Sequence, residues 1–326
     1  KSAWLLPKAS SWAALGEDLR RHLSVLGESE ETWDDWKKGV AAAAPDVDTN
    51  DLRDWEVLTA REREAALALG FTERSWNSVE MYDLDSAWRD LFGAGLESCV
   101  TQGCDLDSLD PAVWLAERHP KVFVSFGCHP KAAWSYDDAF EARLVAALER
   151  CGPKALAWGE FGLDYAHPHF GRLADNRRKQ KEVFVRQLRL AVSRGHPLVL
   201  HSRAADRDTL RIMRQWVPRD WKVHVHSFRG TVQFMQALLE DFSNCYIGIP
   251  GIITMADMDA QELARRCPLE RMVLETDAPF LPVAGNFLSH PGLIPDIIDK
   301  VAELKGIQSA EVAKRVRSNA RAIYGI

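Results

Sequence analysis

The sequence contains four short apolar runs that each end in a side chain able to bind a metal ion. The runs are ALAWGE, LVLHS, VHVHS and VLETD, and their closing side chains are Glu160, His201, His226 and Asp277. Each run has the length and the small or β-branched composition of a buried strand. Helically spaced apolar residues lie between the runs, namely Phe140, Leu144, Val145 and Leu148, then Phe184, Leu188 and Val192, then Leu210, Met213 and Val217. Strand therefore alternates with helix, which predicts a parallel sheet.

Three further runs, LESCVTQG, KVFVSFG and NCYIGI, bring the expected strands to seven between residues 97 and 277. Seven strands are one short of a closed (β/α)8 barrel. In such a barrel the side chains at the carboxyl ends of the strands converge on one face. We therefore predict an α/β fold of the TIM-like barrel type in which the four closing side chains share one site.

These four side chains have the chemistry of a divalent metal centre. Carboxylate and imidazole ligands suit zinc, manganese or magnesium, and one glutamate between two ions is able to bridge them. Two ions about 3.5–4 Å apart activate water and hold both reacting oxygens of a displacement at phosphorus. A single such residue at a strand end is more often a helix cap or a structural histidine, but the repetition on four strands favours hydrolysis of phosphodiesters.

Eight motifs carry a resemblance to a known family. In chain order they are FGCHP, WGEFGLDY, PLVLHSRAADRD, HVHSFRGT, IGIPGIIT, LETDAPFL, SHPGLIPDI and SNARAIYGI. The sequence from about residue 84 to 326 resembles the TatD-type metal-dependent deoxyribonucleases, which are amidohydrolase-like TIM barrels. The pair His224 and His226 and the SHPG motif resemble most closely the eukaryotic branch of that family.

The resemblance implies a divalent-metal nuclease that acts on DNA, or on RNA, at strand ends. It implies that Glu160 bridges two ions, that His201 and His226 hold one of them, and that Asp277 holds the other and orients the attacking water. It also places four further side chains near the substrate phosphates, namely His129, Arg203, Arg229 and His290. Arginine suits this role because its guanidinium binds a phosphate through two hydrogen bonds.

The sequence departs from the family at the first barrel strand, which therefore is degenerate. The family has His-x-His-Leu-Asp there, whereas the corresponding segment SVEMYDLD places Met81 and Asp83 at the histidine positions. Asp83 together with Glu160 and Asp277 would make an oxygen-rich site that favours magnesium or manganese over zinc. Alternatively, the first ion is lost and the barrel serves as a binding or scaffold protein. A sequence that omits the true first strand would give the same pattern.

The first quarter of the chain contains an internal repeat with an offset of 43 residues. The paired positions are Trp12 and Trp55, Leu15 and Leu58, Leu26 and Leu69, Gly27 and Gly70, Ser29 and Thr72, Glu30 and Glu73, and Trp33 and Trp76. The pattern predicts two helical hairpins in a module of residues 1–78, followed by the barrel in residues 79–326. Core packing is the favoured role of the tryptophans. Contact with another protein and stacking on single-stranded bases are the alternatives.

Composition limits the partners of this 326-residue chain. Its net charge of -6 argues against a broad surface that coats nucleic acid, so recognition of a strand has to be local. Six cysteines without a regular spacing suggest reduced thiols in an intracellular protein of the cytoplasm or nucleus. We expect no membrane partner, because no apolar run approaches the length of a membrane span. Hydrolysis of an ester or amide outside nucleic acids remains an alternative within the wider amidohydrolase group.

Overall fold

The computed structural model describes residues 92–326 except 94, 168–169, 282 and 285–288. The predicted helical repeats of residues 1–78, the degenerate first strand and Asp83 all lie outside the described residues. The division of the chain into residues 1–78 and 79–326 therefore stays a prediction.

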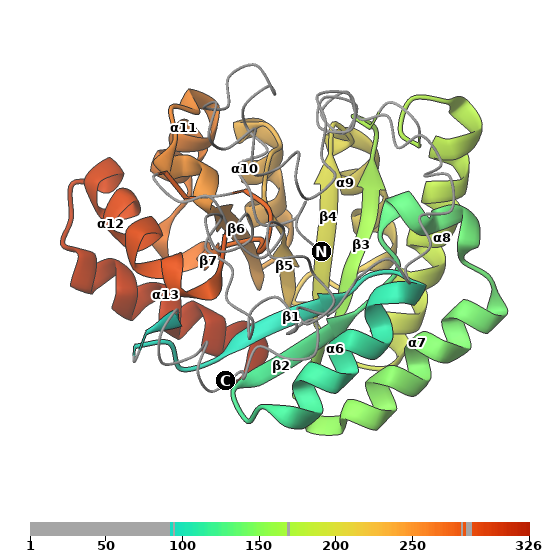
Figure 1. The fold of residues 1–326 in the computed structure, drawn as a ribbon. Helices are drawn as coiled ribbons and strands as arrows, with labels where there is room; N and C mark the ends of the chain where they lie inside the picture. The colour runs from blue at the N-terminus through green and yellow to red at the C-terminus, as the bar shows by residue number, and fades with distance from the viewer. Residues whose placement is uncertain (1–91, 94, 168–169, 282, 285–288) are drawn as a thin grey trace, which may run out of the picture. The chain divides into compact units, whose positions relative to one another are not determined.

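The described residues form one parallel sheet of seven strands whose order in space follows their order in the chain. The strands are β1 (Cys99–Gly103), β2 (Val122–Phe126), β3 (Ala155–Asp164), β4 (Leu198–Arg203), β5 (Val223–Val225), β6 (Cys245–Pro250) and β7 (Met272–Glu275). Figure 1 shows the sheet curling in sequence order from β1 to β7. This arrangement confirms the predicted TIM-like barrel, with its seven recognisable strands.

Helices alternate with the strands and cover the outer side of the sheet (Figure 1). The α-helices are α6 (Leu106–Arg118), α7 (Asp138–Cys151), α8 (Ala174–Ser193), α9 (Asp206–Trp216), α10 (Val232–Asp241), α11 (Met258–Arg266), α12 (Ile294–Lys305) and α13 (Ser309–Tyr324). The 3-10 helices are η6 (Pro130–Ser135), η7 (Gly152–Lys154), η8 (Gly251–Thr254), η9 (Leu269–Arg271) and η10 (Pro291–Leu293). The three segments with helical spacing in the sequence correspond to α7, α8 and α9.

Side-chain caps fix where several of these helices begin. Asp105, Asp137, Thr231 and Asp257 each accept a hydrogen bond from a backbone N–H in the first turn of α6, α7, α10 and α11. Such a cap satisfies a donor that has no partner within the helix. Because each of these helices follows a strand, the caps also set the geometry of the loops at the carboxyl edge of the sheet.

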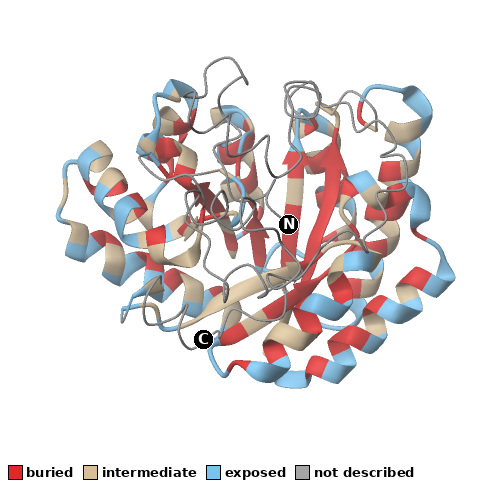
Figure 2. Cartoon of the chain, in the orientation of Figure 1, coloured by how far each residue is buried: buried red, intermediate tan, exposed pale blue. Residues whose placement is uncertain are grey.

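The core lies between the sheet and the helices. Figure 2 shows buried residues along the strands and on the inward sides of the helices, and exposed residues on the outward sides. Leu198, Leu200 and Leu144 are fully buried, and burial of one such side chain contributes about 1.5–3 kcal/mol. The polar residues at the strand ends are thus supported by a rigid apolar frame. Among the described residues, no helix is both long and apolar enough to cross a membrane.

Candidate metal centre

Glu160 reaches the centre of the carboxyl face because of an irregularity in β3. Gly159 pairs with Val199 of β4 and Phe161 pairs with Leu200, so Glu160 is an extra residue between two consecutive pairs. A bulge of this kind turns a side chain away from the regular alternation of the strand. Gly159 has φ 153° and leaves no room for a Cβ against Val199. The sequence WGEFG therefore encodes both the bulge and the glycine that permits it.

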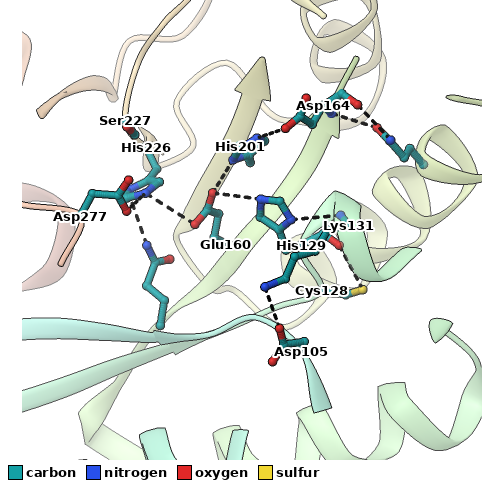
Figure 3. A network of polar contacts seen from close by, with 12 residues as sticks. Asp105, Cys128, His129, Lys131, Glu160, Asp164, His201, His226, Ser227 and Asp277 are labelled. Carbon is teal, nitrogen blue, oxygen red and sulfur yellow. Dashed lines mark hydrogen bonds and ion pairs between the residues drawn. The ribbon is translucent and has the colours of Figure 1, made fainter. Parts of the chain in front are cut away.

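Three histidines surround the Glu160 carboxylate (Figure 3). His201 Nδ1 at the end of β4 is hydrogen-bonded to Glu160 Oε1. His226 Nε2, just after β5, lies 3.5 Å from Glu160 Oε2, and His129 Nε2, just after β2, lies 3.8 Å from Glu160 Oε1. The two carboxylate oxygens thus face different histidines, which is the arrangement expected of a carboxylate between two cations.

Two further carboxylates complete the group. Asp277 Oδ1 lies 3.1 Å from His226 Nε2, on the side of the imidazole that also faces Glu160 (Figure 3). Asp164 Oδ2 at the end of β3 lies 3.4 Å from His201 Nε2. Asp277 has a left-handed backbone with φ 52°, a conformation that costs free energy for a residue other than glycine and is concentrated at functional sites. The sequence-predicted residues Glu160, His201, His226 and Asp277 are therefore brought together by four different strands.

The Glu275 carboxylate contacts His226 at the ring nitrogen that faces away from Glu160. Glu275 Oε2 accepts a hydrogen bond from His226 Nδ1 at 2.7 Å, and the backbone N–H of Ser227 donates to Glu275 Oε1. A carboxylate on one imidazole nitrogen fixes the tautomer and leaves the other nitrogen free to bind a metal. Glu275 therefore directs His226 Nε2 toward Glu160 and Asp277.

Glu275 is in turn linked to the last helix, α13, through His224 and Tyr324. Tyr324 of α13 lies 2.6 Å from His224 Nδ1, and His224 Nε2 lies 3.2 Å from Glu275 Oε2. Burial raises the pKa of Tyr324, so its hydroxyl stays protonated and donates to His224. Gly248 of β6 makes room for this pair, because a Cβ there would come within 2.5 Å of both Glu275 Oε1 and His224 Nε2.

The cluster sets the protonation of its members before any metal binds. Burial disfavours a charged imidazole at His201. The carboxylates of Glu160 and Asp164 have the larger opposite effect and raise the pKa of His201 to about 9. Burial likewise disfavours a charged Glu160, yet His226 and His201 hold the pKa of this carboxyl well below its usual range. At Glu275, His226 and His224 overcome burial and lower the pKa to about 2. In the metal-free centre, the negative charge of the carboxylates is thus neutralised by protonated imidazoles. A bound cation would take over this neutralisation, and the imidazoles would lose their protons.

His129 differs from the other histidines of the centre. Its Nδ1 accepts a hydrogen bond from the Lys131 backbone N–H at 3.0 Å, so the neutral ring carries its proton on Nε2. Burial lowers the pKa of His129 to about 3. The Nε2–H therefore faces the centre as a donor rather than as a free ligand atom, and the place of His129 near a substrate phosphate stays a prediction.

The other predicted phosphate-binding residues lie in separate surroundings. Arg203 ends β4 with an exposed side chain. Arg229 lies 3.5 Å from Asp257 and lines a cavity of about 1200 Å³ beside the loops after β4 and β5. His290 precedes η10 and stacks near Phe92 with ring centroids 6.1 Å apart, and its buried Nδ1 has no hydrogen-bond partner among the residues that the structure describes. No contact within the described residues joins these three side chains directly to Glu160.

Sequence reasoning missed Asp164, Glu275 and Tyr324 as members of this site. Asp164 closes the same strand that carries Glu160, and Glu275 lies two residues before Asp277, so nearness in sequence to a predicted site residue was a usable signal for both. Tyr324 carried no such signal, because its partner His224 is distant in the sequence and approaches only in the folded chain.

The donor set fits a divalent cation. Polar atoms of His129, Glu160 and His201 lie within 4.8 Å of one another, as do those of His224, His226 and Glu275. Because His129 presents an N–H in the first group, Glu160 and His201 are the candidate ligands there. The contacts of Glu275 and His224 identify the second group as the support of His226. Comparison with known families then gave a decisive match, because the family model described as TatD related DNase matches residues 77–325, well over half of the chain.

The chain belongs to the TatD-related DNase family.

Curated relatives agree with this TatD assignment. The human protein named 3'-5' RNA nuclease TATDN2 is 35% identical over 242 residues, which are 72% of this chain but 31% of that protein. The Escherichia coli protein named 3'-5' ssDNA/RNA exonuclease TatD is 27% identical over 252 residues, which are 75% of this chain and 94% of that protein. The chain thus spans about a third of the human relative and nearly all of the bacterial one. The match to the human protein agrees with the expected similarity to the eukaryotic TatD branch.

Solved structures of TatD proteins share the fold. The Escherichia coli TatD homologue YJJV superposes with a TM-score of 0.64 at 24% identity, covering 71% of this chain and 88% of that chain. A TatD family hydrolase from Entamoeba histolytica superposes with a TM-score of 0.61 at 21% identity, covering 71% and 85%. These similarities confirm the TIM-like barrel.

Replacement of Glu275 by glutamine is expected to weaken divalent-metal binding about 10- to 100-fold, because loss of a carboxylate that orients a metal-binding histidine has effects of this size. The amide keeps the shape of the side chain but removes the charge that fixes His226. Titration of metal-free protein with manganese would measure the change. Glu311→Gln, on the exposed face of α13, is the matched control. Unchanged affinity in Glu275→Gln would contradict the orienting role.

The metal-free protein is expected to lose stability as the pH rises from 6.5 to about 9. The folded-state pKa of His201 lies above its ordinary value of 6.5, so its stabilising charge is fully present below pH 6.5 and is lost as the pH passes through about 9. Urea unfolding across this range would measure the trend. His201→Gln should lessen the trend without abolishing it, because burial of His226 is outweighed by Glu160 and Glu275, which raise the pKa of His226 as well. Saturating manganese should flatten the trend because the bound metal requires neutral imidazole. A free energy of unfolding that rises with pH in this range would contradict the assignment.

Proposed function

We propose that the chain is a divalent-metal-dependent nuclease that hydrolyses phosphodiester bonds in single-stranded DNA or RNA. The observation that carries this proposal is the convergence of Glu160, His201, His226 and Asp277 at the carboxyl ends of strands β3, β4, β5 and β7 (Figure 3). The names of the bacterial and human relatives agree with such a substrate and with removal of nucleotides from the 3' end.

In this proposal the protein residues have separate roles. Glu160 would hold two cations, and His201 and His226 would complete the ligands of one of them. A divalent cation there supplies charge stabilisation at the phosphate and makes water more acidic. Asp277 helps hold the cations and accepts the proton of the attacking water, and the His129 Nε2–H donates to a phosphate oxygen. Arg203, Arg229 and His290 contact phosphates farther along the strand.

The proposed metal is magnesium or manganese, with zinc as the alternative. Asp83, which replaces the family's histidine, would join Glu160 and Asp277 at one ion, and oxygen ligands favour the harder cations. The imidazoles of His201 and His226 leave manganese or zinc open at the other position. Elemental analysis of protein purified without added metal, with Asp83→Ala compared in parallel, would test one ion against two.

The six cysteines support an intracellular site of action, in the cytoplasm or nucleus. All six are free thiols in the structure, and burial raises the pKa of Cys128 and Cys267 to about 12. Buried, protonated thiols resist oxidation and suit a reducing compartment.

The barrel of residues 79–326 is the proposed catalytic domain, and contact with another protein is the proposed role of the tryptophan repeats in residues 1–78.

Degradation of end-labelled oligonucleotides tests the function. Single-stranded DNA and RNA of one sequence, labelled at either end, would be incubated with the protein and graded magnesium or manganese. Stepwise loss from the 3' end that stops in chelator is the expected result. Absence of cleavage of every strand in every metal would overturn the proposal and favour the binding or scaffold alternative. Cleavage of chromogenic esters without cleavage of strands would favour the amidohydrolase alternative.

A further inference from the structure

One side of the metal centre carries an unusual concentration of positive charge. Residues 171–181, with the sequence GRLADNRRKQK, contain five cationic side chains and one carboxylate, in a chain whose net charge is -6. They lead into α8 and form its first two turns. Cations at the start of a helix oppose its dipole, so helix stability does not account for them. A local basic segment is the feature that a negatively charged nuclease needs in order to bind a polyanion.

Two of these cations have no internal partner among the described residues. Lys181 lies 3.5 Å from Asp208, Arg178 lies 3.2 Å from Asp175, and the Arg177 guanidinium stacks over Tyr165. Arg172, which is exposed, and Lys179, which is partly exposed, make no hydrogen bond or ion pair within the described part of the chain. These two side chains are free to contact phosphates.

An exposed tryptophan lies next to the same segment. Trp134 of η6 is 60% exposed, and its indole N–H donates to Asn176 Oδ1 in the first turn of α8 at 2.8 Å. This hydrogen bond fixes the orientation of the indole ring, and the rest of the ring stays exposed to solvent. A large aromatic surface left exposed in this way is typical of a binding site.

Trp134 also lies close to the metal centre. The cap of η6 is His129, whose Nε2 faces Glu160 (Figure 3). Trp134 is the fifth residue after His129 along η6, a backbone rise of about 10 Å, which equals roughly three steps of a stacked strand. Phe170, two residues before Arg172, packs edge-on against His129 with ring centroids 6.4 Å apart and stacks on His167 at 3.8 Å. The path outward from the centre is therefore lined by rings and then by cations.

The cavity next to this basic segment, whose lining residues Asp208 and Tyr165 contact Lys181 and Arg177, is less suited to a polyanion. The cavity of about 1200 Å³ beside the loops after β4 and β5 is lined by Asp206, Asp208, Asp257, Asp259 and Glu262, against three arginines. Its carboxylates outnumber its cations, so apart from the phosphate that Arg229 is proposed to contact, it would attract a phosphate backbone less than the basic segment does. A strand that leaves the metal centre is therefore favoured on the side of η6 and α8.

We propose that Trp134, Phe170, Arg172 and Lys179, together called the η6–α8 strip, bind the single-stranded nucleic acid beyond the scissile bond. Trp134 stacks on a base about three nucleotides from the centre, and Arg172 and Lys179 bind the phosphates beside it. Stacking on an aromatic ring requires an unpaired base but no particular sequence. The strip thus selects single strands without selecting sequence. This inference rests on the proposed nuclease function, because it takes the metal centre as the position of the scissile bond.

Binding of labelled oligo(dT) to the full chain in chelator tests the strip without hydrolysis. Trp134→Ala is expected to weaken binding about 5- to 150-fold, the range for loss of one base–aromatic stack, and Trp134→Phe should restore most of it. The matched control is Met258→Ala, another exposed apolar side chain, on α11 (Figure 1). Blunt duplex of the same length should bind Trp134→Ala and wild type alike.

The cations are tested by the salt dependence of the same binding. Arg172→Gln with Lys179→Gln is expected to reduce the slope of log affinity against log salt by about 1.4, the value for two lost phosphate contacts on a single strand. Lys222→Gln with Lys314→Gln removes the same charge from exposed positions before β5 and on α13, and should leave the slope unchanged.

The outcomes separate this inference from the proposed function. If Trp134→Ala and the Arg172 and Lys179 double variant both bind like wild type, or if Trp134→Ala loses as much affinity for duplex, the strip is overturned. If those variants lose binding as expected but no strand is degraded in magnesium or manganese, the strip stands and the nuclease function fails. If strands are degraded but wild-type binding depends on none of these residues, the function stands and the strip fails.

Discussion

Glu160→Gln is expected to lower the rate of phosphodiester hydrolysis by at least about 10³-fold. The Glu160 carboxylate is the group around which His129, His201 and His226 are arranged, and it is the proposed bridge between the cations. Loss of metal-ion catalysis removes several kcal/mol of transition-state stabilisation, and each 1.36 kcal/mol is a factor of ten in rate. Release of labelled nucleotides at saturating manganese would measure the loss.

A matched control makes this result specific. Glu311→Gln removes the same charge from the exposed face of α13 and should retain the wild-type rate. The unfolding transition of Glu160→Gln should also be recorded, because the substitution removes one carboxylate partner from each of His201 and His226. A folded Glu160→Gln protein that degrades strands at the wild-type rate would exclude this centre as the site of hydrolysis.

Asp277→Asn is expected to lower the same rate about 10²- to 10⁴-fold, the range for loss of a group that accepts a proton in the transition state. The asparagine amide keeps the size of the side chain and tolerates the left-handed backbone at φ 52°, so the fold should persist. Its amide is neither basic nor anionic, so it serves neither proposed role of Asp277. Single-turnover hydrolysis as a function of pH would measure the effect.

The dependence of the rate on manganese concentration separates the two roles of Asp277. Loss of metal alone should be compensated by a higher manganese concentration, whereas loss of a proton acceptor should not. Asp259→Asn, at an exposed position of α11, is the control. An Asp277→Asn protein with the wild-type rate and pH profile would assign the proton-accepting role to another residue.

Much of the fold was predictable because its signals are local. The apolar runs before Glu160, His201 and His226 each correspond to a strand, and the helical spacing of Phe140, Leu144 and Leu148 corresponds to α7. A buried parallel strand requires continuous apolar sequence and a covering helix requires apolar residues at helical spacing. The convergence of strand-end residues then follows from barrel geometry rather than from any single motif.

The details of the site were less predictable because they depend on contacts across the barrel. The bulge that turns Glu160 inward is defined by pairing with β4, and a sequence does not contain its own pairing register. Arg229 was expected beside phosphate, but its contact with Asp257 arises from a loop after another strand. Asp83 and the degenerate first strand remain predictions, because they lie outside the described residues.

Gly248 changes how variants of such a protein should be interpreted. It sits in a buried apolar strand and has no side chain, so it would be classed as a structural position by any scan that looks for reactive groups. Yet the space above its Cα is occupied by Glu275 and His224. A single added methyl group there would displace the carboxylate that orients His226. In a screen of natural variants, a glycine-to-alanine change at this position belongs with loss-of-activity alleles of the catalytic residues rather than with benign core substitutions.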